Sequence, residues 1–297
     1  MRRYFLLLSW AVVVATVPLL RVEASQSKAR PAVTVTAEAR ALRPGEVVLL
    51  TVETRSDISS VRVHAFDRDF AGFPLTPRKW RVLVGIDLDT APQAYSADVF
   101  ASDPVATRVP LRVVAGHFRT RKLTVDEAFV NPPPDAIERI ARETAELNEL
   151  WAHSSTTKLW TSPFVRPVPD PANSAFGTRS ILNGQPRSPH SGADFNSATG
   201  TPIKSPSAGR VVLAGDRYYT GNTVMIDHGL QLFSLFAHLS EIQVKVGDAV
   251  AAGDVLGKVG ATGRVTGPHL HWSVRLNGAR VDPLSLLAVL GSEPTRK

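Results

Sequence analysis

Between residue 32 and about residue 124, hydrophobic positions alternate with polar ones over short stretches, as in strands that bury one face. Val33 and Val35, for example, alternate with two threonines, and the turn-rich residues 43–45 separate this run from the next. Short strands at such spacing are typical of an immunoglobulin-like β-sandwich. The further strands that the pattern predicts lie at residues 47–52, 61–63, 80–86, 95–100 and 109–114.

The pattern breaks at residues 131–135, which read Asn-Pro-Pro-Pro-Asp. Three consecutive prolines fit neither a helix interior nor a central strand. From Ala136 to about Trp151 the apolar residues recur at helical spacing, and charged residues fill the opposite face. Pro134 and Asp135 are suitable residues for a helix start. The segment therefore predicts a linker helix between two folded units.

A second β-rich unit follows, from Trp160 to about Leu290, and ends in a short helix over residues 285–290. Asn277-Gly278 is a strong signal for a hairpin turn. The strands expected here lie at residues 210–214, 224–227, 232–239, 242–246, 250–251, 255–259 and 269–276. The chain is thus expected to be mainly all-β, with a sandwich at 31–124, a proline break and linker helix at 131–159, and an antiparallel sheet domain at 160–291.

The first 24 residues resemble a secretory signal peptide. Arg2 and Arg3 precede a nearly apolar stretch over residues 4–20, and Ala24 is a suitable cleavage position. The alternative is an uncleaved membrane anchor, for which about 17 apolar residues is the short limit. No later stretch is long enough to span a bilayer. The sequence therefore predicts export.

Charge and cysteine content narrow the chemistry. The formal net charge is +7, and removal of residues 1–24 takes away three arginines and one glutamate, which leaves +5. A basic exported protein suits an anionic polymer such as cell wall. Nucleic acid is not expected as a partner, because the lysines and arginines are scattered without aromatic interleaving. The chain has no cysteine, so any metal site must use histidines and carboxylates.

Five of the eight histidines fall in the second unit, and two of them are His269 and His271 at the start of an expected strand. Residues two apart in a strand point to the same face, so both imidazoles are expected to face one space and Leu270 the other. Neighbouring imidazoles each need hydrogen-bond partners. A metal site or a catalytic dyad would provide them.

His190 and Asp194 add an imidazole and a carboxylate at a spacing of four, and Gly192 between them is expected to let the chain bend so that both reach one ion. Catalytic zinc is bound by about three such protein ligands and a water. The other histidines are expected in packing, surface or turn positions, namely His64, His117, His153 and His228. Two positions stay open for five further residues, ordinary loop surface or the lining of a substrate groove. These residues are Arg179, Arg217, Tyr218, Tyr219 and Asn222.

These elements occur together with three further segments, and the combination is specific. The chain resembles the lysostaphin-type (LytM-like) zinc metallopeptidases that cleave peptidoglycan peptides, over about residues 160–290. The resemblance rests on the segments 190–195 (HSGADF), 221–229 (GNTVMIDHG), 236–240 (FAHLS), 246–248 (VGD), 262–272 (TGRVTGPHLHW) and 281–283 (VDP).

The resemblance implies one Zn²⁺ per chain, with His190, Asp194 and His271 as its ligands. His238 and His269 are implied as a catalytic pair, one of them the general base, and spacing does not decide which. The implied function is a zinc-dependent peptidoglycan endopeptidase that hydrolyses stem peptides or cross-links with zinc-activated water. Peptidoglycan is the expected partner, together with other cell-wall enzymes, and no membrane contact is expected beyond the signal segment. Combined with export, the resemblance implies the periplasm or cell envelope of a bacterium.

Two rival functions fit parts of the sequence. The first is a non-enzymatic activator of a cell-wall amidase, and the complete ligand set favours an enzyme over it. The second is a biotinyl or lipoyl carrier, which needs a lysine at a hairpin tip where this chain has Asp227-His228-Gly229. The scissile bond stays open between a glycine bridge and a D-alanyl to diaminopimelate cross-link. Targeting, partner binding and autoinhibition all stay open for the N-terminal domain.

Overall fold

The computed structural model describes residues 20–23, 33–102, 105–124, 127, 130–160, 163–173 and 176–291. Most of the predicted signal peptide lies outside these residues. Its described part is strand β1 (Leu20–Glu23), which pairs antiparallel with β2. Among the described residues, no helix combines the length and apolar character needed to cross a membrane.

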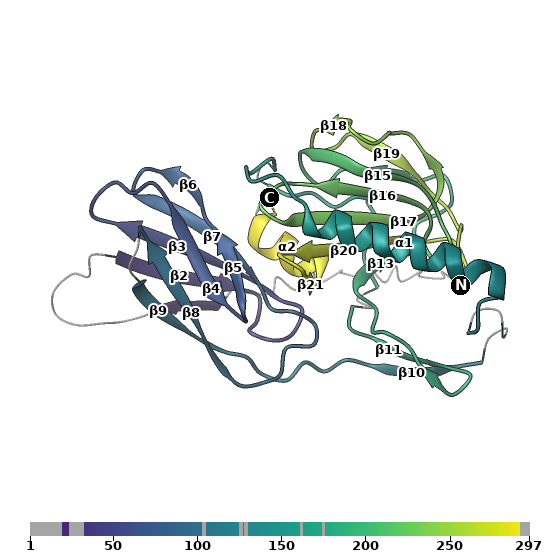
Figure 1. Ribbon diagram of the computed structural model, residues 1–297, viewed down its shortest axis with the longest axis horizontal. Coiled ribbons are helices and arrows are strands. Elements are labelled where there is room, and N and C mark those ends of the chain that lie inside the picture. Colours follow the sequence, from purple (N-terminus) through teal and green to yellow (C-terminus); the bar gives the residue numbers. More distant parts are fainter. Residues whose placement is uncertain are drawn as a thin grey trace, which may run out of the picture.

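The N-terminal half is a sandwich of two antiparallel sheets, drawn in purple and blue in Figure 1. One sheet has the order β1-β2-β3-β7-β6, and the other has the order β5-β4-β8-β9. Alternate residues of β2 are buried, as the alternating pattern predicts. The bounds are β2 (Val33–Ala39), β3 (Val47–Thr54), β4 (Val61–Ala65), β5 (Arg68–Ala71), β6 (Phe73–Thr76), β7 (Lys79–Gly85), β8 (Ala94–Ala101) and β9 (Val105–Arg112).

From β9 the chain crosses to the other half of the molecule along residues 113–119 and enters a small three-stranded sheet (Figure 1). In this sheet β10 (Thr120–Leu123) pairs in parallel with β11 (Arg179–Leu182), and β11 pairs with β12 (Gln185–Pro186). The sheet therefore combines the connecting segment with a hairpin that directly precedes His190. The sequence pattern did not predict it, because the three strands are short and mostly polar.

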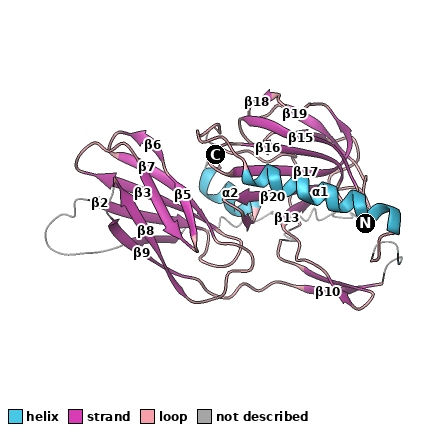
Figure 2. Cartoon of the chain, viewed as in Figure 1, coloured by secondary structure: helices cyan, strands magenta, loops and turns pink. Residues whose placement is uncertain are grey.

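Helix α1 (Pro134–Ala152) starts right after Pro133, in agreement with the predicted linker helix. Proline suits the first helical turn because the N–H it lacks has no partner there. The C-terminal turns of α1 place Leu147, Leu150 and Trp151 against one face of the large sheet. The Trp151 ring meets Phe233 edge-on, with centroids 5.4 Å apart. Figure 2 shows α1 lying across the strands.

The C-terminal half is built on a nine-stranded antiparallel sheet whose main path is β13-β20-β17-β16-β15-β18. The strand expected at residues 242–246 is wrong, because Ile242 is the last residue of the long β17 and a loop follows. The bounds are β13 (Gly192–Phe195), β14 (Pro202–Lys204), β15 (Gly209–Arg217), β16 (Gly221–Asp227), β17 (Leu232–Ile242), β18 (Ala249–Val250), β19 (Val255–Val259), β20 (Leu270–Leu276), β21 (Ala279–Val281) and helix α2 (Pro283–Leu290).

The two halves share a hydrophobic core, since one large cluster of buried side chains includes residues of both. Helix α2 lies between them (Figure 1), and its start is bonded to the sandwich. Asp282 donates its backbone N–H to the carbonyl of Gly45 at 2.7 Å, and Val47 donates its N–H to the hydroxyl of Ser285 at 2.8 Å. The sandwich is therefore packed on the sheet domain as a fixed part of the same molecule.

A buried ion network reinforces this junction. Glu46, which is 1% exposed, accepts hydrogen bonds from Arg40 at 2.9 to 3.2 Å and from Arg43 at 3.0 Å. Arg40 also reaches Asp282, the N-cap residue of α2, at 2.5 Å. The network joins a turn of the sandwich to the last helix of the sheet domain.

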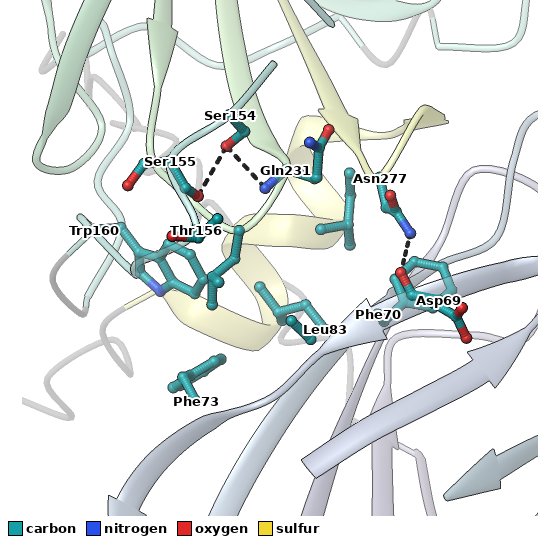
Figure 3. A pocket seen from close by; sticks show the side chains of 13 residues that line it. Asp69, Phe70, Phe73, Leu83, Ser154, Ser155, Thr156, Trp160, Gln231 and Asn277 are labelled. Atoms are coloured by element: carbon teal, nitrogen blue, oxygen red, sulfur yellow. Dashed lines mark hydrogen bonds between the residues drawn. The ribbon is translucent and has the colours of Figure 1, made fainter. Parts of the chain in front are cut away.

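A pocket of about 200 Å³ lies at the same junction, on another side (Figure 3). Phe70, Phe73 and Leu83 line it from the sandwich, and Trp160 and Leu276 from the sheet domain. Leu276 is five residues along β20 from His271, which is roughly 17 Å in a strand. This pocket is a gap in the packing between the halves, and the histidine cluster lies elsewhere.

We predict that Glu46→Ala destabilises the protein by about 3 kcal/mol, because it leaves the guanidinium of Arg40 without its buried partner. The matched control is Glu53→Ala, since the ion pair of Glu53 with Lys79 is about half exposed and should contribute less than about 1 kcal/mol. Urea unfolding measures both values. Equal losses in the two variants would contradict a structural role for the buried network.

Candidate metal centre

The site is built on the register of three neighbouring strands. In the antiparallel pair of β13 and β20, Asp194 lies directly opposite His271, and β17 places Ala237 on the other side of His271. Directly opposite residues share a face of the sheet. Asp194 and His271 therefore project from one face, while the neighbouring Phe195 and Trp272 are fully buried in the core behind it.

His190 reaches the same place from outside the strands. It precedes β13, and its backbone N–H and C=O bond to the carbonyl of Thr178 and the N–H of Gly177. The expectation that Gly192 bends the chain is wrong, because Gly192 lies within β13 and its φ is not in the left-handed region. A Cβ at Gly192 would lie 2.6 Å from Cε1 of His271. Glycine is needed here so that the imidazole can approach the backbone.

Three ligand atoms converge on one point. Nε2 of His190 lies 3.0 Å from Oδ1 of Asp194 and 3.0 Å from Nδ1 of His271, and the last two atoms are 2.9 Å apart. Ligand atoms at two corners of a tetrahedron around zinc are about 3.3 Å apart when each bond is about 2.0 to 2.1 Å. The donor set and its spacing therefore fit one small divalent cation with little adjustment.

The protonation states suit metal binding. Burial raises the pKa of Asp194, but hydrogen bonds from His190 and His271 outweigh this and hold the pKa well below its usual range. Burial lowers the pKa of His271, and the bond to Asp194 offsets this only in part. An ionised carboxylate and a neutral imidazole are the forms that coordinate a cation.

His238 stands beside this trio in a strained backbone conformation. Its φ is +68°, in the left-handed region, and it lies where β17 stops pairing with β20 and starts pairing with β19. The backbone N–H of His238 bonds to the carbonyl of Thr220 at 2.8 Å. Its Nδ1 lies 2.9 Å from the carbonyl of Thr262, an acceptor, so Nδ1 carries the proton. Burial lowers the pKa of His238 to about 4, which keeps the ring neutral at neutral pH.

His269 completes the cluster. Its Nδ1 lies 2.9 Å from the carbonyl of Gly267, so this nitrogen also carries the proton. Its Nε2 is 3.9 Å from Oδ1 of Asp194, and its ring centroid is 4.9 Å from that of His238. In the neutral ring of His238, Nε2 is therefore the unprotonated nitrogen, and Nε2 of His269 faces the carboxylate of Asp194. Leu270 is fully buried on the opposite face, as expected from the strand pattern.

The remaining histidines lie apart from this cluster. His64, His117 and His153 are exposed. His228 is fully buried, and its Nδ1 lies 2.8 Å from the carbonyl of Ala208 while its Nε2 lies 3.0 Å from the hydroxyl of Ser234. The sequence indicates a turn position for His228. In the structure its buried ring also joins Ala208 to Ser234 by hydrogen bonds.

The five groove candidates have mixed positions. Arg217 binds Glu146 of α1 at 2.7 and 2.9 Å, which assigns it to helix attachment. Tyr219 packs under the guanidinium of Arg264, 4.4 Å from ring centroid to Cζ, in the loop that supports His238.

The sequence does not reveal the backbone acceptors of Thr220, Thr262 and Gly267 that hold the two flanking histidines, because a carbonyl leaves no side-chain signature.

Comparison with known proteins agrees with this geometry. The model of peptidase family M23 matches residues 188–283. A crystal structure of an M23 peptidase from Pseudomonas aeruginosa superimposes with a TM-score of 0.67 and 36% identity, covering 84% of this chain and 96% of that one. The chain therefore belongs to peptidase family M23, as the sequence resemblance implies.

Curated relatives match over about a third of this chain. Peptidoglycan DD-endopeptidase ShyA of Vibrio cholerae is 39% identical over 109 residues, which are 37% of this chain and 25% of that protein. DD-carboxypeptidase/endopeptidase Mpg of Neisseria meningitidis is 42% identical over 97 residues, 33% of this chain and 22% of that protein. The matched segment thus spans about a quarter of these relatives.

His228 makes stability depend on pH. Burial lowers its pKa from 6.5 to about 4, so between these values the unfolded chain binds the proton and the folded chain does not. The stabilisation is complete above pH 6.5 and is lost as the pH falls. We predict that the loss of unfolding free energy from pH 7 to pH 5 is about 2 kcal/mol smaller in His228→Gln. Urea unfolding at both pH values measures it, and an unchanged loss would contradict the assignment.

Proposed function

We propose that this protein is a zinc-dependent endopeptidase that hydrolyses peptide cross-links in peptidoglycan. The observation that carries the proposal is the convergence of Nε2 of His190, Oδ1 of Asp194 and Nδ1 of His271 beside two further imidazoles. Membership of peptidase family M23 supports the peptidase class. Two nitrogens and one carboxylate oxygen are the ligand types of catalytic zinc sites.

In this proposal His190, Asp194 and His271 hold one Zn²⁺ per chain. Bound zinc lowers the pKa of a coordinated water and polarises the scissile carbonyl. Asp194 contributes the only negative charge of the trio, so the ligands neutralise half of the charge of the ion. The buried Phe195 and Trp272 keep β13 and β20 in register, and this fixes the distance between Asp194 and His271.

His238 and His269 are proposed to move protons. Hydrolysis of a peptide bond requires that the attacking water loses a proton and that the leaving amine gains one. Each ring donates Nδ1–H to a backbone carbonyl, and Nε2 is therefore the atom that accepts or returns a proton. The two carbonyls, of Thr262 and Gly267, also fix the ring orientations. The two imidazoles, with ring centroids 4.9 Å apart, can serve the two proton transfers.

The proposed substrate is the D,D cross-link between the terminal D-alanine of one stem peptide and the diaminopimelate of another. Of the two relatives above, ShyA is named a DD-endopeptidase and Mpg a DD-carboxypeptidase/endopeptidase, and these names favour the D,D bond over a glycine bridge. Without residues 1–24 the chain keeps a formal net charge of +5, which suits an anionic wall polymer. With residues 1–24 as a signal peptide, the enzyme would act in the cell envelope.

Digestion of purified muropeptide dimers tests the proposal directly. We predict that the zinc-loaded protein converts D,D-cross-linked dimers to monomers, and that a chelator stops the reaction. Mass spectrometry of the products identifies the cleaved bond. Dimers that stay intact with zinc bound would contradict the substrate, and a protein that binds no zinc would contradict the enzyme and favour the amidase activator.

Replacement of either flanking histidine separates chemistry from metal binding. We predict that His269→Ala and His238→Ala each lower kcat by at least about 100-fold, because a positioned acid–base group contributes on the order of 10² to 10⁴. Zinc content should stay at one per chain in both. His153→Ala is the control, because its exposed ring bonds to Glu149 of α1, away from the histidine cluster. Full turnover in His269→Ala would refute the role of that residue.

A further inference from the structure

The three proposed zinc ligands are held in different ways. Asp194 and His271 lie in paired strands, whereas His190 lies in a stretch without regular structure. Metal-binding histidines usually fix their ring through a hydrogen bond from the second nitrogen. The buried Nδ1 of His190 has no such protein partner among the described residues. The position of His190 therefore depends on what holds its backbone.

A turn at residues 176–178 holds that backbone. Gly177 donates its N–H to the carbonyl of His190 at 2.7 Å, and His190 donates its N–H to the carbonyl of Thr178 at 2.9 Å. A little earlier, Asn173 donates its N–H to the carbonyl of Asp194 at 2.9 Å. The segment that carries this turn thus runs alongside both ligands of the His-x-x-x-Asp motif.

Two aromatic rings attach this turn to the N-terminal half. Phe118, from the segment that leaves the sandwich, packs against Gly177, where a Cβ would come within 2.1 Å of its ring. Phe176 reaches Gly45 in the sandwich turn, where a Cβ would come within 2.2 Å of its ring. The rings of Phe118 and Phe176 meet edge-on, with centroids 6.4 Å apart. We call this arrangement the phenylalanine clamp.

The sandwich end of the clamp is itself rigid. Gly45 donates its N–H to the carbonyl of Ile86 at 2.8 Å and accepts from Asp282 at 2.7 Å. A cavity of about 190 Å³ separates the two rings from the Arg40 and Glu46 network. Each ring is half-buried, so a smaller side chain would leave the turn unsupported on this side.

We infer that Phe118 and Phe176 are positioning residues that hold His190 in place for the metal, so that the N-terminal sandwich completes the active site. The inference rests on the proposed function of the site. It gives the sandwich a task that the sequence left open. Neither ring touches the ligand atoms, and each acts through the backbone bonds between residues 177–178 and His190.

Zinc affinity of the full-length protein tests the inference, with zinc alone as the probe in competition with a chromophoric chelator. We expect Phe118→Ala and Phe176→Ala to weaken zinc binding roughly 10- to 100-fold, as loss of a supporting residue does at other metal sites. Phe118→Leu should restore most of the affinity by filling the same space. Phe66→Ala is the control, since Phe66 forms a ring pair with Tyr95 within the sandwich.

Two glycine variants provide a second test of the clamp in case the phenylalanine variants do not fold. Gly177 and Gly184 both have a left-handed φ, of +76° and +80°, but a Cβ at Gly184 meets nothing within 4 Å. Both alanine variants carry the same backbone strain. Only Gly177→Ala pushes against Phe118, so only that variant is expected to lose zinc affinity.

The outcomes separate the two proposals. The clamp would be overturned, and the proposed function left intact, by wild-type zinc affinity in Phe118→Ala, Phe176→Ala and Gly177→Ala. Thermal unfolding shows whether each variant is folded at the temperature of the zinc measurement. Equal losses in Gly177→Ala and Gly184→Ala would also overturn it. A wild-type protein that binds no zinc would overturn the proposed function and the clamp with it.

Discussion

The register between β13 and β20 is the constraint on which the site depends. It places Asp194 opposite His271 on one face of the sheet, and the fully buried Phe195 and Trp272 on the other. A slip of β13 by one residue would turn Asp194 into the core and the ring of Phe195 outward, away from His271. The hydrophobic effect on the rear face therefore fixes the geometry on the front face. This explains how a site of polar groups keeps its shape without a disulfide in a chain that has no cysteine.

Strain at His238 is the second element of the site. A left-handed residue other than glycine costs on the order of 1 to 3 kcal/mol and persists only where the surroundings enforce it. Here the carbonyls of Thr220 and Thr262 bind the backbone and the ring of His238. The bulge at this point is the consequence of a strand that changes partners, from β20 to β19. A regular strand would direct the next side chain after Ala237 to the buried face, so the bulge is what turns the imidazole toward the trio.

The sequence predicts the parts of this protein that follow a periodic pattern or a side-chain motif. The alternation at Val33 and Val35, the amphipathic helix and the His-x-His spacing each have one dominant physical cause, and each agrees with the structure. The misses have a different origin. Strands β5, β6 and β10 to β12 are too short to show a period. The role of Gly192 depends on how closely the His271 ring approaches it, and the supports of His238 and His269 are backbone carbonyls. Contacts of this kind become visible only when segments far apart in sequence are brought together.

The junction between the halves bears on how the N-terminal sandwich serves the site. A lid that swings away would have to separate Arg40 from Asp282. It would also have to separate Arg280 from Asp87 and Asp89, to which Arg280 binds at 2.7 Å each. It would also expose apolar surface of the shared core, at about 25 cal/mol per Å². These costs favour a fixed support over a moving cover. A sandwich that stays in place can influence the site only by supporting a residue that the strands do not already hold. Among the three ligands this residue is His190, because Asp194 and His271 lie in paired strands.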